Sequence, residues 1–115
     1  MPTLIIATNR PLDRAEQESV ARRASALVAE LVGKDERWVM VSVRAGEAMR
    51  YGGSDAPCAY LELKSLGLAP AAGEAIAAGL CGFVEEALEV PPARVYIEMA
   101  APDPALFGWN GSTFA

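Results

Sequence analysis

The chain has 115 residues, which fits one compact domain, residues 1–115, and leaves little room for a second. Its formal net charge is −5 and it contains no histidine. These properties argue against a nucleic-acid partner, a Ser-His-Asp triad and a conventional zinc site, so we expect no metal.

The first half of the chain predicts a strand, a helix and a second strand. Residues 3–8 form an apolar, β-branched run that is typical of a strand buried on both faces. Asp13 and Glu16 have the spacing of a capping box at a helix start, and Gly33 is well placed to end that helix. The apolar stripe of this helix is Val20, Ala24, Leu27, Val28 and Leu31. Residues 38–43 alternate as in a half-buried strand, with Val39, Val41 and Val43 on one face.

The second half repeats this order after a loop at residues 46–57, which is rich in glycine, serine, aspartate and proline. Residues 58–65 alternate as a strand, with Ala59, Leu61 and Leu63 on one face. A helix follows whose stripe is Ile76, Leu80, Phe83, Val84 and Leu88, although Gly79 and Gly82 each weaken it by about 1 kcal/mol relative to alanine. Pro91-Pro92 ends it, and a last strand carries Val95, Ile97 and Met99 on one face.

The order of elements predicts an α+β fold. Two βαβ units normally form a four-stranded sheet with both helices on one face, which leaves the other face bare. A bare face of that size favours an oligomer. The tail at residues 107–114 has three aromatic side chains, so we expect it to dock on the body or on a neighbouring subunit.

Cellular location follows from what the sequence lacks. No apolar run approaches the roughly 20 residues of a membrane helix, and the N-terminal residues lack the features of a signal peptide. We therefore expect no membrane partner and a cytoplasmic protein, with release that needs no signal peptide as the alternative. Cys58 and Cys81 lie in apolar surroundings and are predicted to be buried free thiols.

A series of short motifs resembles the macrophage migration inhibitory factor family of the tautomerase superfamily over essentially the whole chain. Each motif alone is weak, but together and in order they are specific. They are Met1-Pro2 leading to Thr8-Asn9, Gly33-Lys34, Gly52-Gly53-Ser54 running to Pro57-Cys58-Ala59, Ser65-Leu66-Gly67, Leu80-Cys81-Gly82, Arg94-Val95-Tyr96-Ile97, Gly108-Trp109-Asn110 and Ser112-Thr113-Phe114-Ala115.

The resemblance implies a homotrimer in which three sheets wrap a central channel, with active sites at the subunit interfaces. It also implies a cofactor-independent keto–enol tautomerase, an isomerase, acting on phenylpyruvate-like or dopachrome-like compounds. The expected substrate is a small aromatic 2-keto acid or its enol.

Pro2 is the general base that the resemblance implies, once Met1 has been removed. A free α-amino group has a pKa near 7.7–8.0, and an apolar pocket beside a cation lowers that pKa further. Such an amine can take a proton from a carbon next to a carbonyl and return it elsewhere. If Met1 is retained, the Pro2 nitrogen is an amide and cannot act as a base; without the resemblance Pro2 is simply a proline near a terminus.

The resemblance also implies the substrate-binding residues. Lys34 would hold a substrate oxygen and lower the pKa of Pro2, the backbone N–H of Leu66 would bind a carboxylate, and Ser65 would add a hydroxyl. Lys34 is otherwise a solvated lysine after a helix. The aromatic walls would come from Tyr96, across the interface, and from Trp109 and Phe114, with Trp38 and Phe107 near the rim. Packing is the alternative role for each of these aromatic residues.

Two positions depart from the family pattern. Glu98 stands where the best-known member has asparagine, and a carboxylate there would repel an anionic substrate and raise the pKa of Pro2, unless it pairs with a nearby Arg or Lys. The mammalian Cys-x-x-Cys motif is reduced to Cys58-Ala59-Tyr60-Leu61, so we expect no thiol oxidoreductase activity. The alternative functions are a receptor-binding, cytokine-like trimer with a vestigial pocket and a trimer without chemistry.

Overall fold

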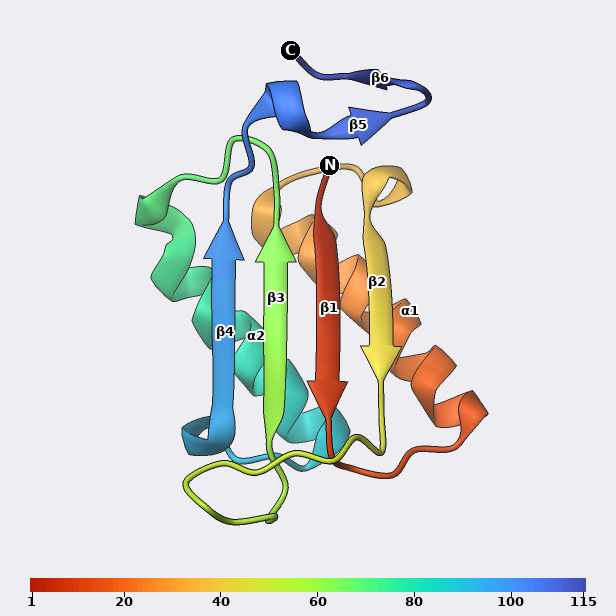
Figure 1. The fold of residues 1–115 in the computed structure, drawn as a ribbon, viewed down its shortest axis with the longest axis vertical. Coiled ribbons are helices and arrows are strands. Elements are labelled where there is room, and N and C mark those ends of the chain that lie inside the picture. Colours follow the sequence, from red (N-terminus) through yellow and green to blue (C-terminus); the bar gives the residue numbers. More distant parts are fainter.

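The computed structural model describes residues 1–115 as one four-stranded sheet with two helices packed against a single face (Figure 1). The strands lie in the order β2-β1-β3-β4. Strand β1 pairs parallel with β2 and antiparallel with β3, and β3 pairs parallel with β4. The bounds of the strands are β1 (Thr3–Thr8), β2 (Met40–Arg44), β3 (Ala59–Lys64) and β4 (Val95–Ala100). The predicted pair of βαβ units is therefore confirmed, and the two units meet along β1 and β3.

Helix α1 (Arg14–Val32) begins and ends where its capping residues predict. The Asp13 carboxylate accepts a hydrogen bond from the Glu16 N–H at 2.7 Å, and the Glu16 carboxylate accepts one from the Asp13 N–H at 3.0 Å. Gly33 adopts the left-handed conformation, φ 67°, and the next N–H, that of Lys34, bonds to the Ala29 carbonyl at 3.0 Å. This turn sets the direction in which Lys34 leaves the helix.

Helix α2 (Gly73–Leu88) crosses α1 at Gly79. A Cβ atom on Gly79 would lie 2.8 Å from Cδ2 of Leu31, closer than side-chain atoms approach one another. The glycine that lowers the helix propensity of this segment therefore allows α1 and α2 to pack closely.

Neither α1 nor α2 combines the length and the apolar character that a membrane-crossing helix needs.

The hydrophobic core lies between the sheet and the two helices. The face predicted for β3 is buried there with most of both helix stripes, whereas the inner residues of the edge strands β2 and β4, apart from Val95, are partly buried and pack against the core. The most deeply buried large side chains include Leu4, Ile6, Leu61, Leu63, Ile76, Leu80, Leu88, Val28 and Val84.

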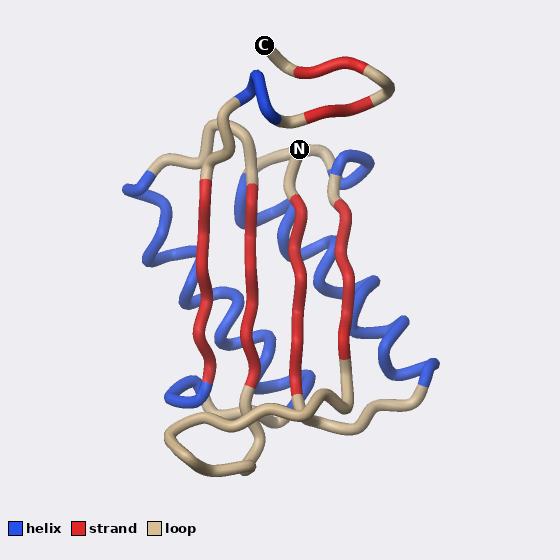
Figure 2. The backbone as a smooth tube through the Cα atoms, in the orientation of Figure 1, coloured by secondary structure: helices blue, strands red, loops and turns tan.

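The opposite face of the sheet has no helix over it, as the backbone trace also shows (Figure 2). Met40 and Tyr96 on this open face are 67% and 63% exposed. Thr3, Ile5 and Ala7 are only half-buried there. The prediction that residues 3–8 are buried on both faces is therefore wrong for the single chain, because both helices lie on the same side of the sheet.

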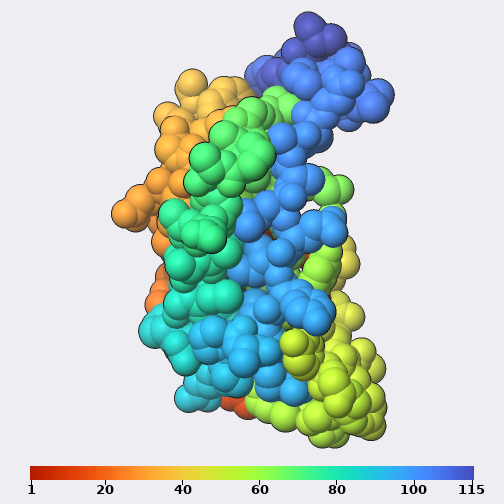
Figure 3. All heavy atoms as spheres, turned by 90° about the vertical axis from the view of Figure 1, so that its left-hand side faces the viewer, coloured from red at the N-terminus to blue at the C-terminus, as the bar shows by residue number.

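Two further segments differ from the prediction or extend it. The strand predicted at 38–43 begins at Met40, because η1 (Glu36–Trp38) forms a turn in which Asp35 accepts a hydrogen bond from the Arg37 N–H at 3.0 Å. The tail forms η4 (Pro104–Leu106) and a hairpin of β5 (Gly108–Trp109) and β6 (Ser112–Thr113). Seen from the side, the tail and the loop at residues 46–57 project at opposite ends of the open face (Figure 3).

Candidate active site

Four segments meet at one end of the sheet: the start of β1, the end of α1, the end of β3 and the tail (Figure 1). The strand register explains the meeting, since Thr3 lies opposite both Met40 and Lys64. Pro2 precedes Thr3, and its carbonyl accepts a hydrogen bond from the Met40 N–H at 3.0 Å. The Pro2 side chain is fully buried. The predicted base position therefore lies inside the structure at the end of the sheet.

Lys34 lies beside the N-terminus. Its half-buried side chain reaches the turn that follows β3, where Nζ donates a hydrogen bond to the Leu66 carbonyl at 2.6 Å. Burial, the charge of Lys34 and a side-chain hydrogen bond with Lys34 together lower the pKa of the Met1 amino group. The Pro2 nitrogen is only three covalent bonds from that amino group. The structure thus places Lys34 beside the chain terminus.

The turn after β3 carries two polar groups without partners. The Ser65 hydroxyl is buried and has no hydrogen-bond partner. The Ser65 backbone is held by Ala100, whose carbonyl accepts from the Ser65 N–H at 3.1 Å. Leu66 gives its carbonyl to Lys34, while its N–H donates no hydrogen bond within the chain. A free N–H and a free hydroxyl therefore lie next to the Lys34 contact.

A hollow of about 250 Å³ opens at this end of the sheet, between the N-terminus and the tail. Its walls are Met1, Thr3, Arg37, Trp38, Val39, Met40, Phe107, Gly108 and Trp109. The Trp38 and Trp109 rings meet edge to face with centroids 5.1 Å apart. This contact confirms that the tail docks on the body of its own chain.

Phe114 supports the tail but does not line this hollow. Its ring stacks on Trp109, with centroids 6.5 Å apart, and lies 6.1 Å from the Phe107 ring. Phe114 was predicted to form an aromatic wall of the site. In the single chain, Trp109 and Phe107 line the hollow and Phe114 packs behind them.

Lys64 and Glu62 were not indicated by any sequence motif, yet they line an adjoining hollow of about 220 Å³ with Thr3, Ile5 and Phe107. Lys64 Nζ and the Glu62 carboxylate form an ion pair at 3.2 Å. The strand alternation already placed both residues on the open face. The antiparallel register of β1 and β3, which places Lys64 opposite Thr3, is the information that would have located them near the N-terminus.

Tyr96 and Glu98 lie away from Pro2 of the same chain. Tyr96 is level with Tyr60, which pairs with Ala7. Ala7 is about 16 Å along β1 from Pro2, at about 3.3 Å per residue. Glu98 lies beside Glu62 on the open face and takes part in no ion pair of the chain. The alternative that Glu98 pairs with a neighbouring Arg or Lys is therefore wrong for the single chain.

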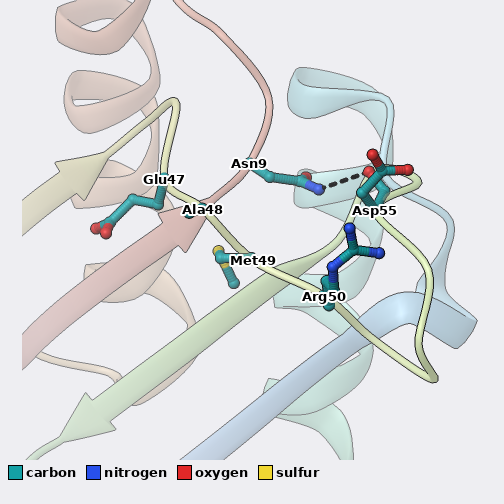
Figure 4. A pocket seen from close by; sticks show the side chains of 6 residues that line it. All are labelled: Asn9, Glu47, Ala48, Met49, Arg50 and Asp55. Carbon is teal, nitrogen blue, oxygen red and sulfur yellow. Dashed lines mark hydrogen bonds between the residues drawn. The ribbon is translucent and has the colours of Figure 1, made fainter.

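The largest hollow, about 530 Å³, lies at the opposite end of the sheet and contains none of the predicted site residues (Figure 4). It is lined by Asn9, Glu47, Ala48, Met49, Arg50 and Asp55. The Asn9 amide donates to the Asp55 and Ala56 carbonyls and its oxygen accepts from the Cys58 N–H at 2.9 Å. Asn9 is thus fully engaged in holding the loop to the sheet.

The cysteines do not form a pair. Cys58 is buried and Cys81 is half-buried, so the prediction of two buried thiols is correct for Cys58 only. Burial and the nearby Glu85 carboxylate raise the pKa of the Cys81 thiol, which makes it a poor nucleophile at neutral pH. No cluster of three or more Cys, Asp or Glu side chains has the arrangement of a metal site.

Comparison with known proteins identifies the family. The sequence model described as macrophage migration inhibitory factor matches residues 1–115. This chain belongs to the macrophage migration inhibitory factor family. A homologue from Brugia malayi is 36% identical over 115 residues, covering 99% of both chains, and the Mus musculus protein is 34% identical over 116 residues, covering all of both.

Solved structures of this family have the same fold. The homologue from Prochlorococcus marinus superimposes with a TM-score of 0.92 at 34% identity, over 98% of this chain and 99% of that one. The factor from Trichinella spiralis gives a TM-score of 0.89 at 27% identity, over 97% and 99% of the two chains. The family is part of the tautomerase superfamily, whose reactions are isomerisations.

Proposed function

We propose that this protein is a cofactor-independent keto–enol tautomerase whose general base is the Pro2 nitrogen, freed by removal of Met1. The observation that carries the proposal is the position of Lys34 beside the chain terminus, where Met1 lines an aromatic-walled hollow. A cation there keeps an N-terminal amine unprotonated near neutral pH, which is the state that a base requires.

The reaction is a balanced movement of one proton. The lone pair of the Pro2 nitrogen takes a proton from the carbon next to the substrate carbonyl, and the C–H electrons form the C=C bond. The carbonyl π electrons move to the oxygen to give an enolate; the protonated Pro2 nitrogen then returns its proton to that oxygen, which yields the enol and regenerates the free amine. The reverse sequence converts the enol to the ketone, so no external oxidant or reductant is needed.

Three groups at this end of the sheet suit the substrate's oxygens. The Lys34 ammonium stabilises negative charge on a carboxylate or enolate oxygen. The unpartnered Leu66 N–H is a donor for a carboxylate, and the buried Ser65 hydroxyl is a second donor. The flat walls formed by Trp38, Phe107 and Trp109 suit an aromatic side chain. These features favour an aromatic 2-keto acid such as phenylpyruvate, or a dopachrome-like compound.

The complete site is proposed to need a neighbouring subunit in a homotrimer. Tyr96 and Glu98 lie too far from Pro2 of the same chain to contact one substrate with it. The open face that carries both residues is free to meet another copy (Figure 2). A trimer would bring Tyr96 of one chain to Pro2 of the next, and sedimentation should then give three times the chain mass of 12.1 kDa.

The test compares phenylpyruvate tautomerisation by the processed wild type and by Pro2→Gly, with intact mass confirming that Met1 is absent from both. We expect the variant to lose at least a hundredfold in kcat/KM, the usual contribution of a positioned base. Equal rates would refute the proposal and favour the receptor-binding alternative with a vestigial pocket. Lys34→Gln should raise KM for phenylpyruvate in the same assay.

A further inference from the structure

Arg37 is the one charged side chain in the wall of the hollow between the N-terminus and the tail. No carboxylate lines this hollow, although the chain has 15 Asp and Glu residues against 10 Lys and Arg residues. A cation that faces a largely apolar hollow, with no acid in the opposite wall, attracts anions. The hollow therefore contains a position for negative charge that the proposed reaction at Pro2 does not use.

The backbone around Arg37 is held in a closed turn. Arg37 is the middle residue of η1, and its N–H donates to the Asp35 carboxylate at 3.0 Å. The next two N–H groups also bond within the turn, Trp38 to the Asp35 carbonyl at 3.1 Å and Val39 to the Glu36 carbonyl at 3.0 Å. The Arg37 side chain therefore starts from a fixed point beside the hollow.

The guanidinium of Arg37 is positioned by an aromatic ring. Its central carbon lies 4.8 Å from the centre of the Trp38 ring, within the range of a cation–π contact. Trp38 is held in turn by its edge-to-face contact with Trp109. Nε of Arg37 lies 3.8 Å from the Asp35 carboxylate, too far for a hydrogen bond, and the guanidinium donates no hydrogen bond within the chain. Its donors are therefore oriented and free to bind a ligand.

Lys34 provides a second cation at a separate position. Its Nζ is bound to the Leu66 carbonyl at 2.6 Å, and it lies beside the Met1 amino group without lining the hollow. Because Met1 does line the hollow, its removal enlarges that space on the side of Lys34. A substrate in the enlarged space would meet Lys34 near Pro2 and Arg37 along the Trp38 wall.

We infer that Arg37 is a specificity-determining residue that selects aromatic 2-keto acids carrying a second carboxylate on the ring. The inference rests on the proposed function, in which Lys34 and the Leu66 N–H hold the keto-acid end of the substrate. The planar guanidinium can donate two parallel hydrogen bonds to a carboxylate. The substrate ring would lie against the aromatic walls of the same hollow.

Arg37 would bind a group that does not react. Such a contact is equally strong in the ground state and in the transition state, so its loss should raise KM and leave kcat nearly unchanged. The Arg37 side chain is 71% exposed, so water screens part of the interaction. The expected increase in KM is about three- to tenfold, between the effect of an exposed ion pair and that of a desolvated charge-assisted hydrogen bond.

The experiment measures tautomerisation by the processed full chain, as wild type and as Arg37→Gln. The substrates are phenylpyruvate, phenylpyruvates with a carboxyl group at the meta or para ring position, and the methyl esters of those ring carboxyls. Each ester has nearly the shape of its acid without the charge. We expect wild type to prefer a ring carboxylate over its ester, and Arg37→Gln to lose that preference through KM. The KM values of phenylpyruvate and the esters should change by less than about twofold.

Two control variants separate charge from geometry. Arg22→Gln removes the same charge from an exposed position of α1 that does not line the hollow, and it should keep the wild-type preference. Arg37→Lys keeps the charge without the planar fork of donors, so it should retain only part of the preference. Added salt should weaken the preference of wild type and leave Arg37→Gln unchanged, because screening acts on a charge contact and not on packing.

The outcomes distinguish this inference from the proposed function. Absence of a carboxylate preference in wild type, its survival in Arg37→Gln, or an equal change in KM for acids and esters would overturn the inference. In each of these cases, a wild type that is faster than Pro2→Gly leaves the proposed function standing. A wild type that is no faster than Pro2→Gly on any of the substrates would overturn both.

Discussion

Arg94 is expected to be the main polar anchor of the loop at residues 46–57. Arg94→Ala removes four hydrogen bonds to backbone carbonyls, with donor–acceptor distances between 2.9 and 3.3 Å, and the contact with the Tyr51 ring. Arg94 is half-buried, so water can replace part of what is lost. At about 0.5–1 kcal/mol for each bond, the free energy of unfolding should fall by about 2–4 kcal/mol.

Urea denaturation followed by circular dichroism measures this change, with all variants at one protein concentration because assembly adds to the apparent stability. Arg94→Lys tests the geometry. A lysine keeps the charge but presents its donors from a single point, so it should recover only a minor part of the loss. Arg22→Ala, at an exposed arginine of α1 without hydrogen bonds or ion pairs, is the control and should change stability by less than about 0.5 kcal/mol.

Two results would refute this reasoning. A loss below about 1 kcal/mol in Arg94→Ala would mean that water satisfies the loop carbonyls as well as the guanidinium does. Wild-type stability in Arg94→Lys would mean that charge alone holds the loop, and that the planar fork of donors is unimportant.

Three further predictions follow from single residues. The proposed Pro2 base would work only unprotonated, so kcat/KM should rise with pH. Lys34→Gln removes the cation beside the chain terminus, whose charge lowers the pKa of the Met1 amino group, so the rising limb of the pH–rate profile should move to higher pH; an unmoved limb would contradict the proposed role of Lys34. Asp13→Ala, which breaks the capping box with Glu16, should cost about 1 kcal/mol in urea denaturation, and Asp13→Asn should recover most of that loss. Leu80→Ala, at a fully buried position of α2, should cost about 2–5 kcal/mol, and a loss below 1 kcal/mol would argue against the observed core.

The sequence by itself determined the elements of this fold, because their signals are local. A capping box spans three residues, so Asp13 and Glu16 locate the start of α1 without reference to the rest of the chain. Alternation at every second residue likewise separates Leu61 and Leu63 from Glu62 and Lys64 on β3. The motifs around Pro2 and Lys34 indicated the family, and the comparisons confirm both the family and its fold.

Local patterns were less informative where a turn or a helix contact overrides them. Trp38 fits the alternation of the following strand, yet Asp35 caps a turn that places it at the wall of the hollow. Gly79 appears unfavourable in a helix until the close approach of Leu31 is known. In both cases the conformation depends on a contact with another residue, and the periodicity of a helix or strand does not predict that contact.

Only the tertiary structure decided which distant residues meet. Lys34 contacts Leu66 because the turn at Gly33 and the register of β1 against β3 bring two segments 32 residues apart to the same end of the sheet. Tyr51 meets Tyr96 because Arg94 fastens a loop onto the start of β4. Such contacts depend on strand order and loop closure, which are properties of the whole chain. For this reason the sequence predicted the candidate residues, and the fold determined which of them can act together.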